Sequence, residues 1–387
     1  MTVERYLLLA LRLGRLDDGV VDAYFGPPEL SDRVEAEPPA TPSDLVTEAD
    51  ALLEQLPDGW LRDQVGGLRT YAGILAGERW EYADEVEACY GIRPERSDPD
   101  SLTAAHQDLE DLLPGPGPLF DRYLAWQRSL EVPAATIEPL MAAVIDEARA
   151  RTRELTGLPA GESITVEYVH DVPWLGYLDY LGDLHGRMSV NVDLPRTAVD
   201  LLHLALHESY PGHQAERVTK EVSLVRERGL LEETVTLVPA PQAVVSEGLA
   251  ELAPELMLDG EYGPAFEAIV RDAGIHLDLA HARAVERAAE PLRWVQVDAA
   301  LMLHAEGRSE AEVGAHVHRW GLVDADVVAH VIRFVTDPTS RSYAICYPAG
   351  LQRCRAYVGQ DADRPWARFR TLLTEQVRVR DLPAPVL

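Results

Sequence analysis

The segment from His207 to His213, HESYPGH, places strong limits on the local fold of this chain, because its two histidines are six residues apart. On an unbroken α-helix, six residues turn by about 600° and rise about 9 Å, so the two imidazoles would diverge by roughly 120°. Pro211 removes the hydrogen bond to the carbonyl of residue 207 and disfavours helical angles at Tyr210, and Gly212 adds backbone freedom. We therefore predict that one helix ends near Tyr210 and that the next begins at His213, with the two histidines facing each other.

Two imidazoles and one carboxylate are a common ligand set for a catalytic zinc ion, whose fourth position stays open to water. His207 and His213 are the candidate histidine ligands, and Glu247, in a later helical segment, is the candidate carboxylate. The small Gly248 next to it would allow that helix to approach the motif helix closely. Glu208 is placed to accept a proton from the water. The pattern predicts a zinc-dependent hydrolase, most simply a peptidase acting on a peptide or small amide, with one zinc ion.

Other interpretations of the same residues stay open. His203 precedes His207 by four residues, so these two could be the ligand pair, with His213 outside the site. A hydrolase of non-peptide amides or esters would use the same ligands. A helical binding protein with a structural metal would instead need four protein ligands, as structural zinc usually does.

Helical periodicity covers most of the chain, and two segments alternate like strands, 163–169 and 187–192. We predict a mainly α fold with one small sheet next to the metal-binding helices. Long helices are expected at 67–90 and 262–287, and a proline-rich connection at 26–43. The length of 387 residues favours two subdomains, a helical one over 1–160 and a metal-binding one with the small sheet over 161–387, packed as one compact unit.

Composition restricts the partners and the compartment. The formal net charge of −30 argues against nucleic acid and anionic membrane surfaces as partners. The apolar run near the N-terminus is interrupted by charge and predicts an amphipathic helix instead of a signal peptide, and no run is long enough to span a membrane. Three scattered cysteines, Cys89, Cys346 and Cys354, suit a reducing cytoplasm and are expected to be buried free thiols. The oligomeric state is not indicated.

Three segments carry a resemblance to a known family: HESYPGH, the later SEGLAEL, and Asp337-Pro338 followed by Ser342-Tyr343-Ala344-Ile345. Together they resemble the bacterial domain-of-unknown-function 885 family, which is grouped with the gluzincin-like metallopeptidases. The matched segments lie within residues 203–358. The chain departs from the family pattern at Gln214, where a further histidine is frequent, and at Leu249, where tryptophan is usual.

The resemblance implies a helical metallopeptidase-like fold, with His207, His213 and Glu247 as ligands and Glu208 as the base. It also suggests Tyr343 as the donor to the oxyanion, although an ordinary core tyrosine would fit the sequence equally well. Gluzincin-like enzymes pair an edge strand with the substrate, and residues 189–192 would take that role. His304 and Arg341 are weaker candidates for substrate contacts, and the aromatic residues Tyr168, Trp174, Tyr177 and Tyr180 line either the cleft or the core.

Overall fold

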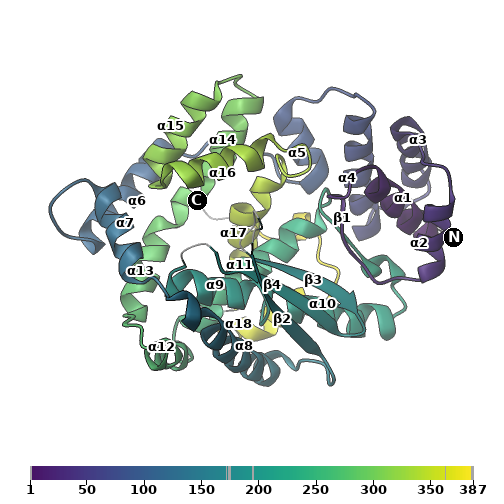
Figure 1. The fold of residues 1–387 in the computed structure, drawn as a ribbon. Helices are drawn as coiled ribbons and strands as arrows, with labels where there is room; N and C mark the ends of the chain where they lie inside the picture. The colour runs from purple at the N-terminus through teal and green to yellow at the C-terminus, as the bar shows by residue number, and fades with distance from the viewer. Residues whose placement is uncertain (1, 171, 173–175, 194–195, 362, 385–387) are drawn as a thin grey trace.

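The computed structural model describes residues 2–384 except 171, 173–175, 194–195 and 362. The described chain is mainly α-helical, with a three-stranded sheet and a two-stranded sheet (Figure 1). The predicted fold class is therefore confirmed. None of the described helices is both long and apolar enough to cross a membrane.

The N-terminal part consists of five helices and one strand: α1 (Thr2–Leu16), β1 (Val21–Tyr24), α2 (Pro28–Ala36), α3 (Pro42–Leu53), α4 (Trp60–Leu75) and α5 (Tyr82–Tyr90). The single helix predicted at 67–90 is wrong, because the chain turns at Gly77, whose φ is +89°. The proline-rich connection at 26–43 contains α2, since proline is well suited to the first turn of a helix.

Three helices lead into the sheet: α6 (Pro99–Leu112), α7 (Leu119–Ser129) and α8 (Ala134–Thr156). The sheet contains β2 (Ser163–Val169), β3 (Gly176–Gly182) and β4 (His185–Asn191) in the order β2-β4-β3. β3 and β4 form a hairpin whose turn residues, Asp183 and Leu184, both have positive φ, as a type I′ turn requires. β4 is therefore the central strand, and the predicted edge strand at 189–192 is wrong. The strand that sequence analysis missed, β3, is an edge strand.

Helices make up most of the chain after the sheet: α9 (Ala198–Glu208), α10 (His213–Lys220), α11 (Gln242–Leu258), α12 (Gly263–Asp272), α13 (Leu279–Ala289), α14 (Val295–His304), α15 (Glu310–Gly321), α16 (Ala325–Thr336), α17 (Cys346–Gly359) and α18 (Pro365–Thr374). The predicted helix at 262–287 is two helices, α12 and α13, which meet near Gly274 at φ +84°. A short strand, β5 (Val235–Leu237), precedes α11.

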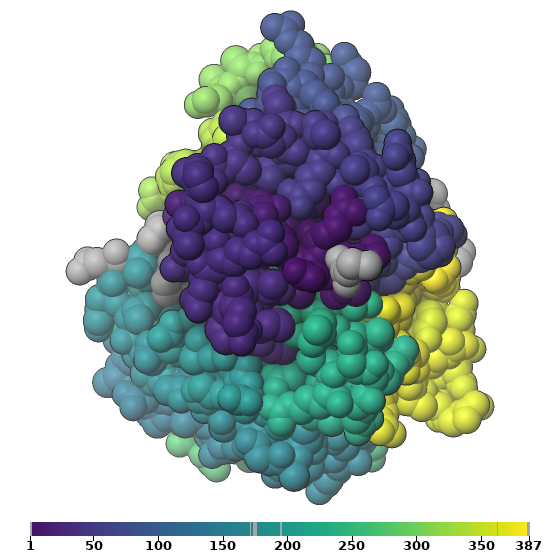
Figure 2. Space-filling model, turned by 90° about the vertical axis from the view of Figure 1, so that its right-hand side faces the viewer, coloured from purple at the N-terminus to yellow at the C-terminus, as the bar shows by residue number. Residues whose placement is uncertain are grey.

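The N-terminal helices pack directly onto the part of the chain that carries the HESYPGH motif. β1 pairs antiparallel with β5, and the apolar core of α1, α3 and α4 includes Val235 and Leu237 of that strand. Figure 2 shows this face, where the N-terminal segment lies against the segments around the sheet and residues 220–240. A second core lies between the sheet, α8 and α9, and a third surrounds α11 and α17. The predicted boundary near residue 160 falls between α8 and β2, and the division into subdomains stays a prediction.

The three cysteines, Cys89, Cys346 and Cys354, are buried free thiols, as predicted.

Candidate metal centre

The helix break predicted from the sequence is present. A capping box of Thr197 and Asp200 starts α9, which ends at Glu208, and α10 begins at His213. Between them the amide of Gly212 donates to the carbonyl of Leu206 at 3.1 Å, which closes a tight turn. The rings of His207 and His213 are 4.7 Å apart between centroids and nearly perpendicular. The break therefore brings together two imidazoles that a straight helix would separate.

Glycine is required at position 212 for space. Its φ is −73°, so the left-handed conformation is not the reason. A Cβ atom at this position would lie 1.9 Å from the carbonyl oxygen of His207 and 2.6 Å from that of Leu206. Any side chain would therefore force the turn open and move His213 away from His207.

Glu247 of α11 completes a group of three potential metal ligands. One of its carboxylate oxygens lies 3.4 Å from Nε2 of His207, and the other lies 3.6 Å from Nε2 of His213. The ligand atoms of the three residues all lie within 4.8 Å of one another. Oε2 of Glu247 is buried and has no hydrogen-bond partner. A buried carboxylate oxygen without a partner is costly, and a cation between these three side chains would remove that cost.

The electrostatics of the three residues are strongly coupled. Burial would raise the pKa of Glu247, but the two facing histidines outweigh it and hold that pKa well below its usual value. Burial lowers the pKa of His207 and His213, yet the facing carboxylates raise both. The negatively charged carboxylate of Glu247 thus faces Nε2 of His207 and Nε2 of His213, and divalent cations bind to such a set of groups.

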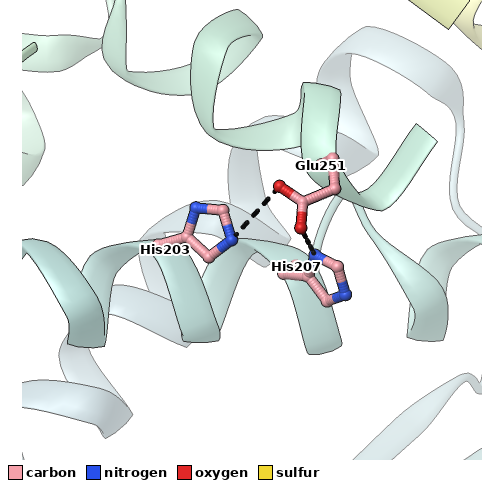
Figure 3. A group of neighbouring side chains, drawn as sticks. All are labelled: His203, His207 and Glu251. Carbon is pink, nitrogen blue, oxygen red and sulfur yellow. Dashed lines mark ion pairs between the residues drawn. The ribbon is translucent and has the colours of Figure 1, made fainter. Parts of the chain in front are cut away.

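A second group, His203, His207 and Glu251, also has the spacing of metal ligands (Figure 3). Glu251 of α11 lies above α9 between the two histidines. It is 3.5 Å from Nε2 of His203 and 3.7 Å from Nδ1 of His207. The guanidinium of Arg293 forms an ion pair with Glu251. A cation already neutralises this carboxylate, so the second group suits a metal ion less well than the first.

The two groups use different nitrogens of His207. Nε2 faces Glu247, whereas Nδ1 faces Glu251. A carboxylate on one ring nitrogen fixes the tautomer and orients the other nitrogen towards a metal. Glu251 faces Nδ1 of His207 at 3.7 Å, which is longer than a hydrogen bond, so the two groups must move slightly closer before Glu251 can orient His207 for the first group.

His213 is supported in a comparable way on its own Nδ1. The hydroxyl of Ser246 lies 3.3 Å from that nitrogen and donates to Glu216 at 2.5 Å. Glu216 forms an ion pair of 2.8 Å with Lys220, the single lysine of the chain. Burial would raise the pKa of Glu216, but Lys220 and Arg217 lower it far below its usual value, so the carboxylate stays charged.

A cavity of about 540 Å³ opens over this centre. It is lined by His207, Glu208, His213, Arg217 and Glu247, by Asp17 and Asp22 near β1, by Gly176, Tyr177 and Leu178 of β3, and by Tyr343 and Tyr347. Glu208 is half-buried, and burial raises its pKa despite the neighbouring histidines. The edge strand β3 thus lines the cavity together with the residue predicted as the base.

The structure also places the remaining candidates. The hydroxyl of Tyr343 donates to Oε1 of Glu247 at 2.5 Å, so this tyrosine belongs to the centre. His304 bonds to the carbonyl of Val335, and Arg341 pairs with Glu85; neither lines the cavity. Among the aromatic residues Tyr177 lines the cavity, and Tyr180 is buried, donating to Glu221. Tyr168 contacts α8, and Trp174 lies outside the described residues.

Sequence reasoning missed several residues of the centre, namely Asp22, Glu216, Arg217, Ser246 and Glu251. Two of them carried a usable signal, because Glu251 follows Glu247 by four residues and Arg217 follows His213 by four. On a helix that spacing places each pair on one face. Asp22 is 185 residues from His207, and it comes close through the pairing of β1 with β5 and through the hydrogen bond from Tyr177 of β3.

Comparisons with known proteins add little to this geometry. No protein-family model matches the chain, and neither does any curated protein. Among solved structures, the chain is similar to a carboxypeptidase from Pyrococcus furiosus in an apo-Mg state, with 10% sequence identity and a TM-score of 0.42. The match covers 97% of this chain and 88% of that one. Similarity at this level transfers no activity to this chain.

Proposed function

We propose that the protein is a zinc-dependent hydrolase that cleaves peptide bonds. The observation that carries the proposal is that the potential ligand atoms of His207, His213 and Glu247 lie within 4.8 Å of one another and that these residues line one cavity together with Glu208. Two imidazoles and a carboxylate suit zinc. In the described part of the chain no fourth protein ligand joins this group, which fits a catalytic site better than a structural one.

His207, His213 and Glu247 would hold a divalent metal, which would supply a Lewis acid for the substrate carbonyl and for a water molecule. The residues of the chain provide the proton transfers. Glu208, whose pKa burial raises, accepts the proton of the attacking water and later delivers it to the nitrogen of the leaving amine. In this proposal the hydroxyl of Tyr343, which donates to Glu247 in the structure, turns to donate a hydrogen bond to the oxygen of the substrate carbonyl as charge develops on it.

The edge strand β3 supports a peptide substrate in particular. Gly176, Tyr177 and Leu178 line the cavity, and among the described residues β3 pairs within its sheet with β4 alone. An extended peptide can add to such an edge through main-chain hydrogen bonds. A small non-peptide amide or ester would make no use of this edge.

Metal analysis of the purified protein, followed by peptide cleavage with and without a chelator, tests the proposal. We expect about one zinc ion per chain and hydrolysis that stops on chelation and returns with zinc. Glu208→Gln should keep the metal and lose turnover. Metal-free protein with full activity would refute the assignment, and faster cleavage of simple esters than of any peptide would favour an esterase.

A further inference from the structure

Among the described residues, Arg217 is the only arginine that lines the cavity. It lies on α10 four residues after His213, so both side chains leave the same face of the helix, about 6 Å apart along its axis. The guanidinium is therefore held one helical turn from a proposed metal ligand.

The charge of Arg217 is not matched by a direct partner. Its terminal nitrogen donates to the hydroxyl of Ser246 at 3.3 Å, and no carboxylate oxygen of the described chain lies within 4 Å of the guanidinium. Arg355 and Arg378 show the contrast, since each pairs with two carboxylates. Arginine remains protonated at every relevant pH and carries five N–H donors in a fixed plane, so most of these donors stay available to a ligand.

The acidic groups nearest to Arg217 are already engaged. Glu216 pairs with Lys220 and accepts from Ser246. Asp22 accepts a hydrogen bond from Tyr177 at 3.1 Å, and burial raises its pKa more than Arg217 lowers it. Glu233 also helps to raise the pKa of Arg217, and Lys220 is the cation that most lowers the pKa of Glu233 itself. None of these carboxylates takes the guanidinium as its direct ion-pair partner.

We propose that Arg217 binds the free carboxylate of a peptide substrate, so that the enzyme removes a C-terminal amino acid. The proposal rests on the hydrolase function given above. A guanidinium matches a carboxylate with two parallel hydrogen bonds. Asp22 and Glu216 beside it would repel a doubly charged phosphate more than a singly charged carboxylate, which selects the carboxylate.

Arg217 lies near the second candidate ligand, because the hydroxyl oxygen of Ser246 is 3.3 Å from a terminal nitrogen of Arg217 and 3.3 Å from Nδ1 of His213. One residue spans about 3.3–3.6 Å of extended chain, so the proposal places the terminal carboxylate at Arg217 and the preceding carbonyl at the metal centre. Water adds its hydroxyl to the carbonyl carbon, the C–N bond breaks, and Glu208 delivers the proton to the nitrogen of the released amino acid. The products are the shortened peptide and a free amino acid.

Binding to the metal-free protein tests Arg217 without turnover. An N-acetylated dipeptide and the same compound with a C-terminal amide are titrated by calorimetry. We expect the acid to bind about 10- to 100-fold more tightly, as a hydrogen-bonded ion pair warrants. Arg217→Met should make the two affinities equal, and Arg217→Lys should keep part of the preference. Arg128→Met removes an exposed arginine of α7 that does not line the cavity, and should leave the preference unchanged.

Hydrolysis by the zinc-loaded protein separates failure of this inference from failure of the proposed function. Cleavage of the acid but not of the amide, with the preference lost in Arg217→Met, supports both. Equal cleavage of acid and amide by the unmodified enzyme overturns the inference and leaves the hydrolase in place. A binding preference without any cleavage supports the role of Arg217 and refutes the hydrolase. A preference that survives Arg217→Met overturns the inference.

Discussion

His207 and His213 each turn Nε2 towards Glu247, and each keeps Nδ1 for a different polar group. The partner on Nδ1 sets the tautomer and hence which lone pair is available to a metal. Substituting residues that contact a ligand but do not bind the metal themselves should therefore change the metal affinity. Glu251 is such a residue for His207, and Ser246 with Glu216 plays the same part for His213.

Glu251→Gln should weaken zinc binding by about 10- to 100-fold, which is typical for loss of such a supporting carboxylate. His203→Ala should leave zinc affinity within a few-fold of the unmodified protein, because the ion pair of His203 is with Glu251 and its only further contact with the group, among the described residues, is the stacking of its ring on that of His207. Competition with a chromophoric chelator measures both. If His203→Ala loses the metal and His213→Ala keeps it, the ion belongs to the group of His203, His207 and Glu251.

Lys220 should matter for stability although it lies outside the ligand set. Its ammonium neutralises Glu216, a carboxylate whose side chain is fully buried. Lys220→Met leaves that charge without its ion pair, which costs about 3–5 kcal/mol of unfolding free energy. The double variant Glu216→Gln with Lys220→Met should recover much of the loss. Urea unfolding measures both, and an unchanged midpoint in Lys220→Met would contradict this account.

At the level of elements, α11 is held in place by its crossing with α17. A Cβ atom at Gly248 would lie 2.3 Å from the carbonyl oxygen of Gly350, and one at Gly350 would lie 2.4 Å from that of Val244. The sequence predicted that Gly248 permits a close approach, but the partner is α17, whereas the motif helix was expected. The crossing therefore helps to fix the position of Glu247 relative to His207 and His213.

Gly248→Ala should therefore cost about 1–3 kcal/mol of stability, as overpacking of a tight contact does, and should also weaken metal binding because Glu247 is displaced. Gly66→Ala is a matched control, since a Cβ atom at this helical glycine of α4 meets no atom within 4 Å. That control should be neutral or slightly stabilising. Thermal unfolding and metal content of both variants are compared. Equal stability of the two variants would show that the crossing tolerates a methyl group.

Sequence patterns predicted those elements whose cause is local. The break at Pro211 and Gly212 follows from the chemistry of two residues, and the helices follow from periodicity. The sheet order could not be predicted, because β2 pairs with β4 although the whole of β3 separates these two strands in the sequence. The residues of the candidate metal centre likewise fall into those that the local sequence predicts and those that it does not. His207, Glu208 and His213 lie within one short segment of the sequence, whereas Asp22 lies far from them in sequence and only the folded chain brings it near.

At the scale of the whole molecule, charged residues tie the end of the chain to its beginning. Arg378 pairs with Asp58 at 2.8 Å and with Asp63 at 2.7 Å, and Arg380 contacts the same two carboxylates. Val379 between them packs in the core around α11 and α17. The C-terminal segment thus fastens the N-terminal helices to the core that positions Glu247.

This tie should make stability depend on pH in a predictable direction. Hydrogen bonds from Arg378 lower the pKa of Asp58 from its usual 3.8 to about 2. Because the pKa is lower in the folded state, the pair contributes stability above about pH 4, and the contribution fades as pH falls towards 2. Asp58 is exposed, so the effect is small and salt should weaken it. Asp58→Asn should lower the melting temperature at pH 7, and the difference from the unmodified protein should shrink steadily between pH 4.5 and 3. A difference that stays constant over that range, or grows, would show that Asp58 acts through something other than its charge.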